Sequence, residues 1–307
     1  MNILGKRYIF FAISLLAIVP GILSLIFGGM PLSLDFTGGS LLEVKFEGVK
    51  PQPAEIIAVY EAENIKDIQV QTTDIGTLVI RSSFLDDPIR EKIISAMEAK
   101  FKSKPTILRF DSVGPSIGEQ VASRAALAVA VAALVVAFYI AFTFRGIAHA
   151  FRYGVCAILA MIHDVAVVFS VAGLGALLLG WEIDSLFLTA LLTVIGFSVQ
   201  DKIVVFDRIR ENSSVLRRLD FETLVNHSVV QTLQRSINTQ LMTVEFLLLA
   251  LALFGGVTLQ EFSVTLLVGL FSGTYSSIFI AASILVVWEK QEWKNWFGGK
   301  KKEEVAA

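Results

Sequence analysis

Long runs of apolar residues dominate this chain, and they recur at six places separated by more polar segments. About 20 apolar residues, each adding roughly 1.5 Å along a helix, cross a hydrocarbon core of roughly 30 Å. The pattern therefore predicts an all-α membrane protein with six transmembrane helices. We place these spans near residues 8–29, 121–144, 153–179, 183–206, 237–255 and 262–288. The first run is longer than the roughly 7–15 apolar residues of a signal peptide, so we expect it to persist as the first span.

The segment 30–120, between the first two spans, has a different pattern that is typical of a small soluble domain. Residues 42–47 alternate apolar and charged side chains, as a half-buried strand does. A helical pattern, a hairpin with its turn at 73–76 and a second helical pattern follow, before a last strand at 106–110. The predicted order β-α-β-β-α-β is that of an α+β ferredoxin-like domain.

Lysine and arginine predict the orientation, because cytoplasmic loops of membrane proteins carry an excess of both. In a six-span arrangement the start of the chain, the loop near 207–236 and the Lys-rich C-terminal tail all fall on one side. The connectors 180–184 and 255–261 fall on the other side and contain neither residue. We therefore expect both termini in the cytoplasm and the small domain outside.

Composition agrees with this division, since 54% of the residues are hydrophobic and only 18% are charged. Four parts are expected along the chain. They are a cytoplasmic N-terminus with the first helix at 1–29, an extracytoplasmic domain at 30–120, helices two to six at 121–288 with a basic cytoplasmic loop near 207–236, and a cytoplasmic tail at 289–307.

Several classes of function have no support in the sequence. Cys156 is the only cysteine, so no disulfide framework is possible. The segment 30–120 has neither His nor Cys, which argues against a metal site or a His-activated nucleophile there. No phosphate-binding G-x-x-x-x-G-K-[ST] motif occurs, so we expect no direct use of ATP. We expect no enzyme activity, no cofactor and no nucleic-acid binding.

Ionisable residues inside the predicted spans are the strongest functional signal. A carboxylate at bilayer depth costs roughly 2.5–3.5 kcal/mol, so it is retained where it has a partner, a proton or a water-filled cavity. Such residues occur in several spans, which favours an ion or proton pathway; they are His163, Asp164, Asp201, Lys202 and Glu245. Two plainer readings stay open: Asp201 as an interfacial aspartate paired with Lys202 or Arg208, and His163–Asp164 as a polar helix-packing pair.

Several strings resemble the bacterial protein-export proteins SecD and SecF. After the first span comes Leu34–Ser40, L-D-F-T-G-G-S, which contains Asp35, Gly38 and Gly39. After the fourth comes Val204–Asn212, V-V-F-D-R-I-R-E-N, which contains Asp207, Arg208, Arg210, Glu211 and Asn212. Three further strings are similar: Val113–Gly118, His163-Asp164 and Gly273–Ala281. The short outer domain and the residues D-R-I-R-E-N of the second string favour the SecF branch.

This resemblance implies a multi-pass protein of the bacterial cytoplasmic (inner) membrane that forms one half of an RND-type transporter. It also implies pairing with SecD, association with the SecYEG channel and contact with membrane lipid and with secreted chains in transit. The implied function is to use the proton gradient to help draw secreted proteins outward. A half-exporter of small molecules or lipids and a passive assembly scaffold remain the alternatives.

The resemblance also implies site residues. The membrane aspartate of the family falls on Asp201, and an arginine at the start of the fifth span falls on Arg235, where it would stabilise the ionised carboxylate. His163 and Asp164 would belong to the same proton pathway. Lys202 replaces a small polar residue and would lower the proton affinity of Asp201, and Glu245 is an additional acid. Accessory hydroxyls on the sixth span would hydrogen-bond water beside Asp201; the candidates are Ser272, Thr274 and Ser276.

Overall fold

The computed structural model describes residues 2–48, 50–73, 76–145, 150–240 and 246–294. The chain divides into two compact units, Leu32–Ala128 and a helical unit made of Met1–Pro31 with Val129–Ala307. Each unit has its own packing, and each is described by itself.

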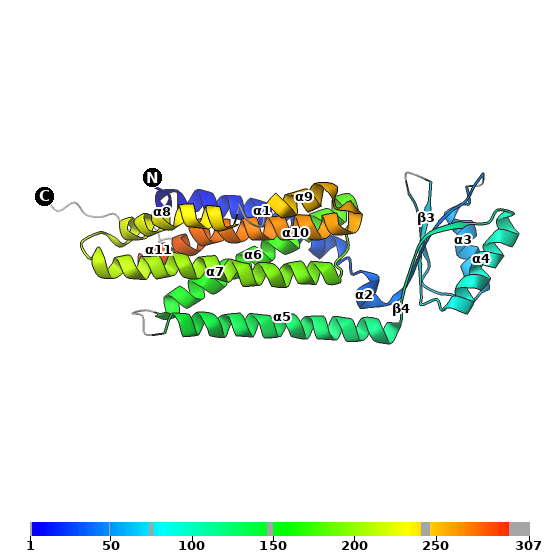
Figure 1. Cartoon of the computed structure of the whole chain (residues 1–307), viewed down its shortest axis with the longest axis horizontal. Coiled ribbons are helices and arrows are strands. Elements are labelled where there is room, and N and C mark those ends of the chain that lie inside the picture. The colour runs from blue at the N-terminus through cyan, green and yellow to red at the C-terminus, as the bar shows by residue number, and fades with distance from the viewer. Residues whose placement is uncertain (1, 49, 74–75, 146–149, 241–245, 295–307) are drawn as a thin grey trace. The chain divides into compact units, whose positions relative to one another are not determined.

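The smaller unit contains a four-stranded sheet with two helices packed on one of its faces (Figure 1). Its elements follow the order predicted from the alternating patterns. They are α2 (Leu34–Thr37), β1 (Gly39–Lys45), α3 (Pro53–Ala62), β2 (Gln69–Thr72), β3 (Leu78–Ser82), α4 (Asp87–Phe101) and β4 (Thr106–Val113), followed by the start of α5 (Pro115–Thr143). The strand order is β2-β3-β1-β4, and all neighbouring strands are antiparallel.

The alternation within β1 explains this layering. Leu42 and Val44 are fully buried against the helices, and Ile80 of β3, which pairs with Leu42, is buried with them. Ile56 of α3 and Ile93 of α4 complete the core from the helical side. Period-two burial on the strands and 3.6-residue burial on the helices thus meet in one apolar layer.

The larger unit is a bundle of long helices lying side by side (Figure 1). Its helices are α1 (Arg7–Gly28), the inner part of α5, α6 (Ala150–Leu179), α7 (Ser185–Val215), α8 (Phe221–Gln240), α9 (Phe246–Phe254), α10 (Gly256–Tyr275), a π-helical turn (Ser276–Ala281) and α11 (Ala282–Glu289). Among the described residues, five helices are long and apolar enough to cross a membrane. They are Leu4–Gly28, Pro115–Thr143, Ala150–Leu179, Ser185–Val215 and Leu259–Glu289.

The predicted fifth span, 237–255, cannot be followed as one helix. Its first residues end α8 at Gln240 and its last residues form the nine-residue α9, while 241–245 lie outside the described part of the chain. Glu245 is one of those residues, so the prediction for Glu245 lies outside the described residues. The fourth span also differs from expectation, because α7 continues to Val215 instead of ending near 206.

Helices α1 and α6 approach each other closely at glycine. A Cβ on Gly21 would lie 2.0 Å from the Ser170 carbonyl oxygen, and one on Gly173 would lie 2.2 Å from that of Gly21. The contact is reinforced by hydrogen bonds from Ser170 Oγ to the Ala17 carbonyl (2.7 Å) and from Ser24 Oγ to the Gly173 carbonyl (2.9 Å). In lipid the hydrophobic effect does not drive helices together, so small residues at a crossing stabilise it by allowing close van der Waals packing.

An ion-pair cluster joins the two ends of the helical unit's chain. The Arg7 guanidinium contacts Glu222 of α8 at 3.0 Å and also pairs with Glu292, beyond α11. Lys290 Nζ donates to Glu222 at 2.6 Å, and this hydrogen bond is the main cause that lowers the pKa of Glu222. Arg7 is therefore more than a topology signal, because it fixes α1 against α8 and the C-terminal segment.

The predicted orientation can be tested with single cysteines. Lys66 and Arg217 are both exposed, the first in the sheet-containing unit and the second after α7. A cysteine at Lys66 should react with a membrane-impermeant thiol reagent in intact spheroplasts, whereas one at Arg217 should react only after lysis. The native Cys156 is buried and gives a low background. The opposite labelling pattern would place the sheet-containing unit in the cytoplasm.

Candidate functional site

Asp164 lies at the centre of the helical bundle and is completely buried. Its Oδ1 is hydrogen-bonded to a ring nitrogen at 3.1 Å and a hydroxyl at 2.7 Å, and its Oδ2 accepts from two hydroxyls and an ammonium at 2.6–2.7 Å. These partners come from α6, α7, α10 and the π turn; they are His163, Ser272, Ser198, Ser276 and Lys202. His163 and Asp164 thus contact each other within a network that includes three serines.

Lys202 takes a different partner from the one predicted. Its side chain is fully buried and forms an ion pair with Asp164 at 2.7 Å. It also donates to the carbonyl and the hydroxyl of Ser198, at 3.1 and 2.5 Å. The plainer alternative, in which Lys202 pairs with Asp201, therefore differs from the observed pairing with Asp164, because consecutive residues of a helix point about 100° apart. The two side chains therefore face different neighbours.

Asp201 is buried, with 8% exposure, and lies about halfway along α7. Ser236 Oγ of α8 donates to its Oδ1 at 2.7 Å, and Ser277 Oγ of the π turn donates to its Oδ2. In the described part of the chain Arg208 bonds Glu211 and Gln231, so the pairing of Asp201 with Arg208 considered in the interfacial reading is not present. Helix α7 continues to Val215, well beyond Asp201. The number of residues between the start of the span and Asp201 therefore did not predict the surroundings of the Asp201 side chain.

The π turn brings the two carboxylates into one arrangement. Ser276 Oγ donates to Asp164 Oδ2 at 2.7 Å, and the next residue, Ser277, donates to Asp201. Single π turns within α-helices occur frequently at functional sites. Adjacent serines on one helix thus contact acidic residues on two other helices.

Arg235 and Thr274 do not reach either carboxylate. The Arg235 side chain is exposed on α8, and in the described part of the chain it has no ion pair with Asp201. Its neighbour Ser236 faces Asp201 instead. Thr274 is buried, but its hydroxyl donates to the Leu270 carbonyl of its own helix at 3.3 Å.

Three serines that contact the carboxylates were not in the predicted set of site residues, namely Ser198, Ser236 and Ser277. Each is a hydroxyl that is buried inside the helical unit. A buried serine in lipid needs a partner, and that requirement is the signal that could have selected them. The identity of each partner depends on how the helices pack.

The V-V-F-D-R-I-R-E-N string holds the end of α7 against α8. Arg208 Nε donates to Gln231 at 2.8 Å, and Asn212 Nδ2 donates to Ser228 at 2.8 Å and to Gln231 at 2.9 Å. Two exposed i,i+3 ion pairs lie on α7 itself; they are Asp207–Arg210 and Arg208–Glu211. The motif thus positions α8, and with it Ser236, beside Asp201.

The double glycine of L-D-F-T-G-G-S lies where the chain turns from α2 into β1. Gly38 and Gly39 have φ of +68° and +112°, a region that favours glycine. A Cβ on Gly118, at the start of α5, would lie 2.7 Å from the Gly38 nitrogen. Asp35 is half-buried in α2, where its backbone N–H donates to Ser33 Oγ at 3.3 Å. Two strings distant in sequence therefore form one tight junction.

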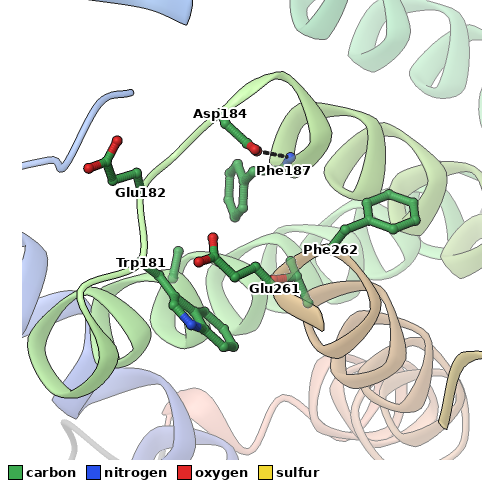
Figure 2. Close-up of a pocket in the computed structure, with 8 residues that line it drawn as sticks. Trp181, Glu182, Asp184, Phe187, Glu261 and Phe262 are labelled. Carbon is green, nitrogen blue, oxygen red and sulfur yellow. Dashed lines mark hydrogen bonds between the residues drawn. The ribbon is translucent and has the colours of Figure 1, made fainter. Parts of the chain in front are cut away.

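Two hollows lie in the helical unit. An open apolar groove of about 310 Å³ between α1, α6 and α10 has His163 and Ser272 in its wall, next to Asp164. Figure 2 shows the second, a small pocket where Trp181, Glu182, Asp184 and Glu261 gather near the start of α7. There Asp184 caps α7 by accepting from the Phe187 N–H at 2.7 Å. The described residues contain no cluster of three or more His, Cys, Asp or Glu suited to a metal.

Comparison with known families gives this site its context. Residues 93–291 match the family model described as "Protein export membrane protein SecD/SecF, C-terminal". Residues 23–48 match the model described as "SecD/SecF GG Motif", which covers Asp35, Gly38 and Gly39. The chain belongs to the SecD/SecF family. The network around Asp164 and Asp201 lies within the residues of the first match.

Similar curated proteins within the SecD/SecF family are translocase subunits. The chain is 64% identical to the protein translocase subunit SecF of Anaerolinea thermophila, over 97% of both chains. It is 43% identical to that of Thermobaculum terrenum, over 100% of this chain and 99% of the relative. The crystal structure of SecDF from Thermus thermophilus, a translocon-associated membrane protein, matches with a TM-score of 0.76 at 33% identity. That match covers 94% of this chain and 39% of the longer one.

Proposed function

We propose that this chain is the SecF-like subunit of a bacterial secretion complex and uses proton movement at Asp201 to assist outward movement of secreted polypeptides. The observation that carries the proposal is a buried carboxylate held by two hydroxyls, Ser236 and Ser277, on two other helices. A change of charge at such a group alters which helix packing is favourable. The names of the relatives, protein translocase subunits SecF and SecDF, support the choice of substrate class.

The proposed architecture has six spans, with the fifth formed by the segment around α9, and both termini in the cytoplasm. The proposed outer domain is ferredoxin-like, supported by the order β1-α3-β2-β3-α4-β4 and the strand order β2-β3-β1-β4. SecD would supply the other half of an RND-type bundle, and SecYEG would supply the channel. Movement of the bundle would be passed to the outer domain, so that both form one two-state element.

Export measured in inner-membrane vesicles tests the proposal against a passive scaffold. Vesicles with and without this chain should differ in export only while a proton gradient is present. Collapsing the gradient with an ionophore should remove the difference. If the difference in export between the two kinds of vesicle persists after the proton gradient is collapsed, the chain acts as a scaffold. If vesicles without the chain export polypeptides normally but lose efflux of an apolar compound, the chain acts as an exporter. Copurification of SecD and channel subunits from native membranes tests the partners.

Arg235 is proposed to serve Asp201 in a second state of the bundle. It directly precedes Ser236, which contacts Asp201, so rotation of α8 by about 100° would bring the guanidinium to the carboxylate. Arg235→Ala should then raise the proton affinity of Asp201 and shift the pH profile of export upward. Arg235→Lys should retain part of the function, because the charge is kept and the bidentate fork is lost. An unchanged profile in Arg235→Ala would remove Arg235 from the pathway.

A further inference from the structure

The Lys202–Asp164 pair has the contacts of two charged groups. Lys202 Nζ has three protons and three acceptors: Asp164 Oδ2, and the carbonyl and hydroxyl oxygens of Ser198. Asp164 is contacted by five side-chain groups on its two oxygens. An ionised carboxylate only accepts, whereas a protonated one must donate and loses acceptor sites. The neighbourhood of Asp164 therefore fits the anion.

Asp201 has the opposite kind of environment. Among the described residues it is hydrogen-bonded by two hydroxyls, those of Ser236 from α8 and Ser277 from the π turn. A hydroxyl can turn to donate to a carboxylate or to accept from a carboxylic acid, so both charge states of Asp201 can be bonded. The charged groups on its surroundings are engaged elsewhere or exposed: Lys202 bonds Asp164, and Arg235 lies on the outside of α8.

The π turn 276–281 connects these two environments. Ser276 bonds Asp164 and also the Gly273 carbonyl at 3.2 Å, while Ser277 bonds Asp201 and also the Thr274 carbonyl at 2.9 Å. A rigid bond at the first serine therefore fixes where the second serine can reach. Because the two serines are adjacent in one turn, the contact of Ser276 with Asp164 helps to hold Ser277 beside Asp201.

We propose that Lys202 and Asp164 form a permanently charged anchor that positions the π turn against Asp201, so that of these two carboxylates only Asp201 exchanges the coupling proton. His163, which contacts Asp164 Oδ1 at 3.1 Å, contributes one of the contacts of this anchor. The role of Asp201 in coupling rests on the proposed function. The charge states assigned to Lys202, Asp164 and Asp201 do not depend on it. Lys202 and Asp164 are positioning residues: neither takes up or releases the proton. On protonation of Asp201, Ser236 or Ser277 turns to accept the new O–H, and the anchored Ser276 holds its place.

Infrared difference spectroscopy of the full chain in lipid nanodiscs tests the charge assignment. Acidification should produce one C=O band of a carboxylic acid in an apolar environment, and Asp201→Asn should remove it. Lys202→Met leaves Asp164 buried without its cation, so a second band should appear. The matched control Lys202→Arg keeps the charge and should show one band. A wild-type band that survives Asp201→Asn, or a Lys202→Met spectrum without a second band, would overturn the proposal.

Insertion of the variants gives an independent measurement, because Lys202→Met could fail to fold. Removing one partner of a buried ion pair is strongly destabilising, whereas removing both charges is often tolerated. The double variant Asp164→Asn/Lys202→Met should therefore insert better than Lys202→Met alone, and it should retain only the band of Asp201. Equal loss of protein in the single and double variants would contradict a charge-paired anchor.

Titration of the Asp201 band tests the link through the π turn. Ser277→Ala removes a hydrogen bond to the ionised form, so the midpoint should rise by about 1 pH unit. Ser276→Ala does not touch Asp201 but loosens the anchor, so it should move the midpoint in the same direction. Thr274→Ala is the control on the same helix, because its hydroxyl donates to the Leu270 carbonyl and contacts neither carboxylate among the described residues, so it should leave the midpoint unchanged. If Ser276→Ala leaves the midpoint of the Asp201 band unchanged, as the control does, the anchor does not act on Asp201.

These measurements are separable from the export assay. If export proves independent of the gradient while the single titrating band belongs to Asp201, the proposed function fails and the charge assignment stands. If export depends on Asp201 but the band of Asp164 also titrates in the wild type, the function stands and the fixed anchor is wrong.

Discussion

Replacing Asp201 by asparagine is expected to abolish the gradient-dependent part of export while leaving the protein inserted. Asparagine keeps the shape of the side chain and its carbonyl can still accept from Ser236 or Ser277, so the packing of α7 should survive. It cannot change charge, so the two states of the bundle would no longer be linked to proton uptake. The measurement is export rate in vesicles with and without a proton gradient, at matched protein level.

Asp220→Asn is the matched control for that experiment. Asp220 is also an aspartate of the helical unit, but it is exposed before α8, where its carboxylate accepts from the Glu222 N–H at 3.2 Å and lies 3.6 Å from Lys290 Nζ. Such an exposed ion pair contributes little to stability, and Lys290 keeps its bond to Glu222 when Asp220 is replaced. Asparagine can make the same capping contact, so export should be close to wild type. Export by the Asp201→Asn variant with unaltered gradient dependence would exclude Asp201 as the proton-exchanging group.

Replacing Gly21 by leucine is expected to separate α1 from α6 and to prevent the normal bundle from forming. Even a Cβ would lie 2.0 Å from the Ser170 carbonyl oxygen, a backbone atom that cannot turn away. The hydrogen bonds that cross the same contact, from Ser170 to Ala17 and from Ser24 to Gly173, would be lost as the helices move apart. Overpacking alone typically costs about 1–3 kcal/mol, and the broken hydrogen bonds add to it.

Thermal unfolding of the purified protein in detergent measures this effect, and Gly28→Leu on the same helix is its control. A Cβ on Gly28 meets no heavy atom within 4 Å, so a side chain there projects into free space. The control should unfold near the wild-type temperature, and Gly21→Leu should unfold well below it. Equal stability of the two variants would mean that α1 and α6 do not touch at Gly21.

The elements of this protein could be predicted from the sequence to a large extent, because their patterns are local. A run of about 20 apolar residues has few alternatives to a membrane helix. The strands of the sheet-containing unit alternate with period two, so Leu42 and Val44 identified the buried face of β1 before any partner was known. The family motifs likewise located Asp201 and the double glycine without information on packing.

The predicted fifth span is a place where local patterns did not predict the helix boundaries. Gln240 and Glu245 interrupt its apolar run, and the described helices α8 and α9 end and begin on either side of that region. The length of α7 was underestimated for a related reason. Its last residues turn polar, which looks like the end of a span, although a helix can continue past the apolar part through contacts with α8.

The sequence by itself determined that ionisable residues occupy the membrane helices, and only the tertiary structure decided which of them meet. Lys202 is adjacent to Asp201 in the chain, yet its ammonium bonds Asp164 on another helix. Ser276 and Ser277 are adjacent as well, yet they contact carboxylates on α6 and α7. The physical reason is that a helix distributes consecutive side chains about 100° apart. Partners in the bundle are therefore set by how whole helices pack, which no local pattern contains.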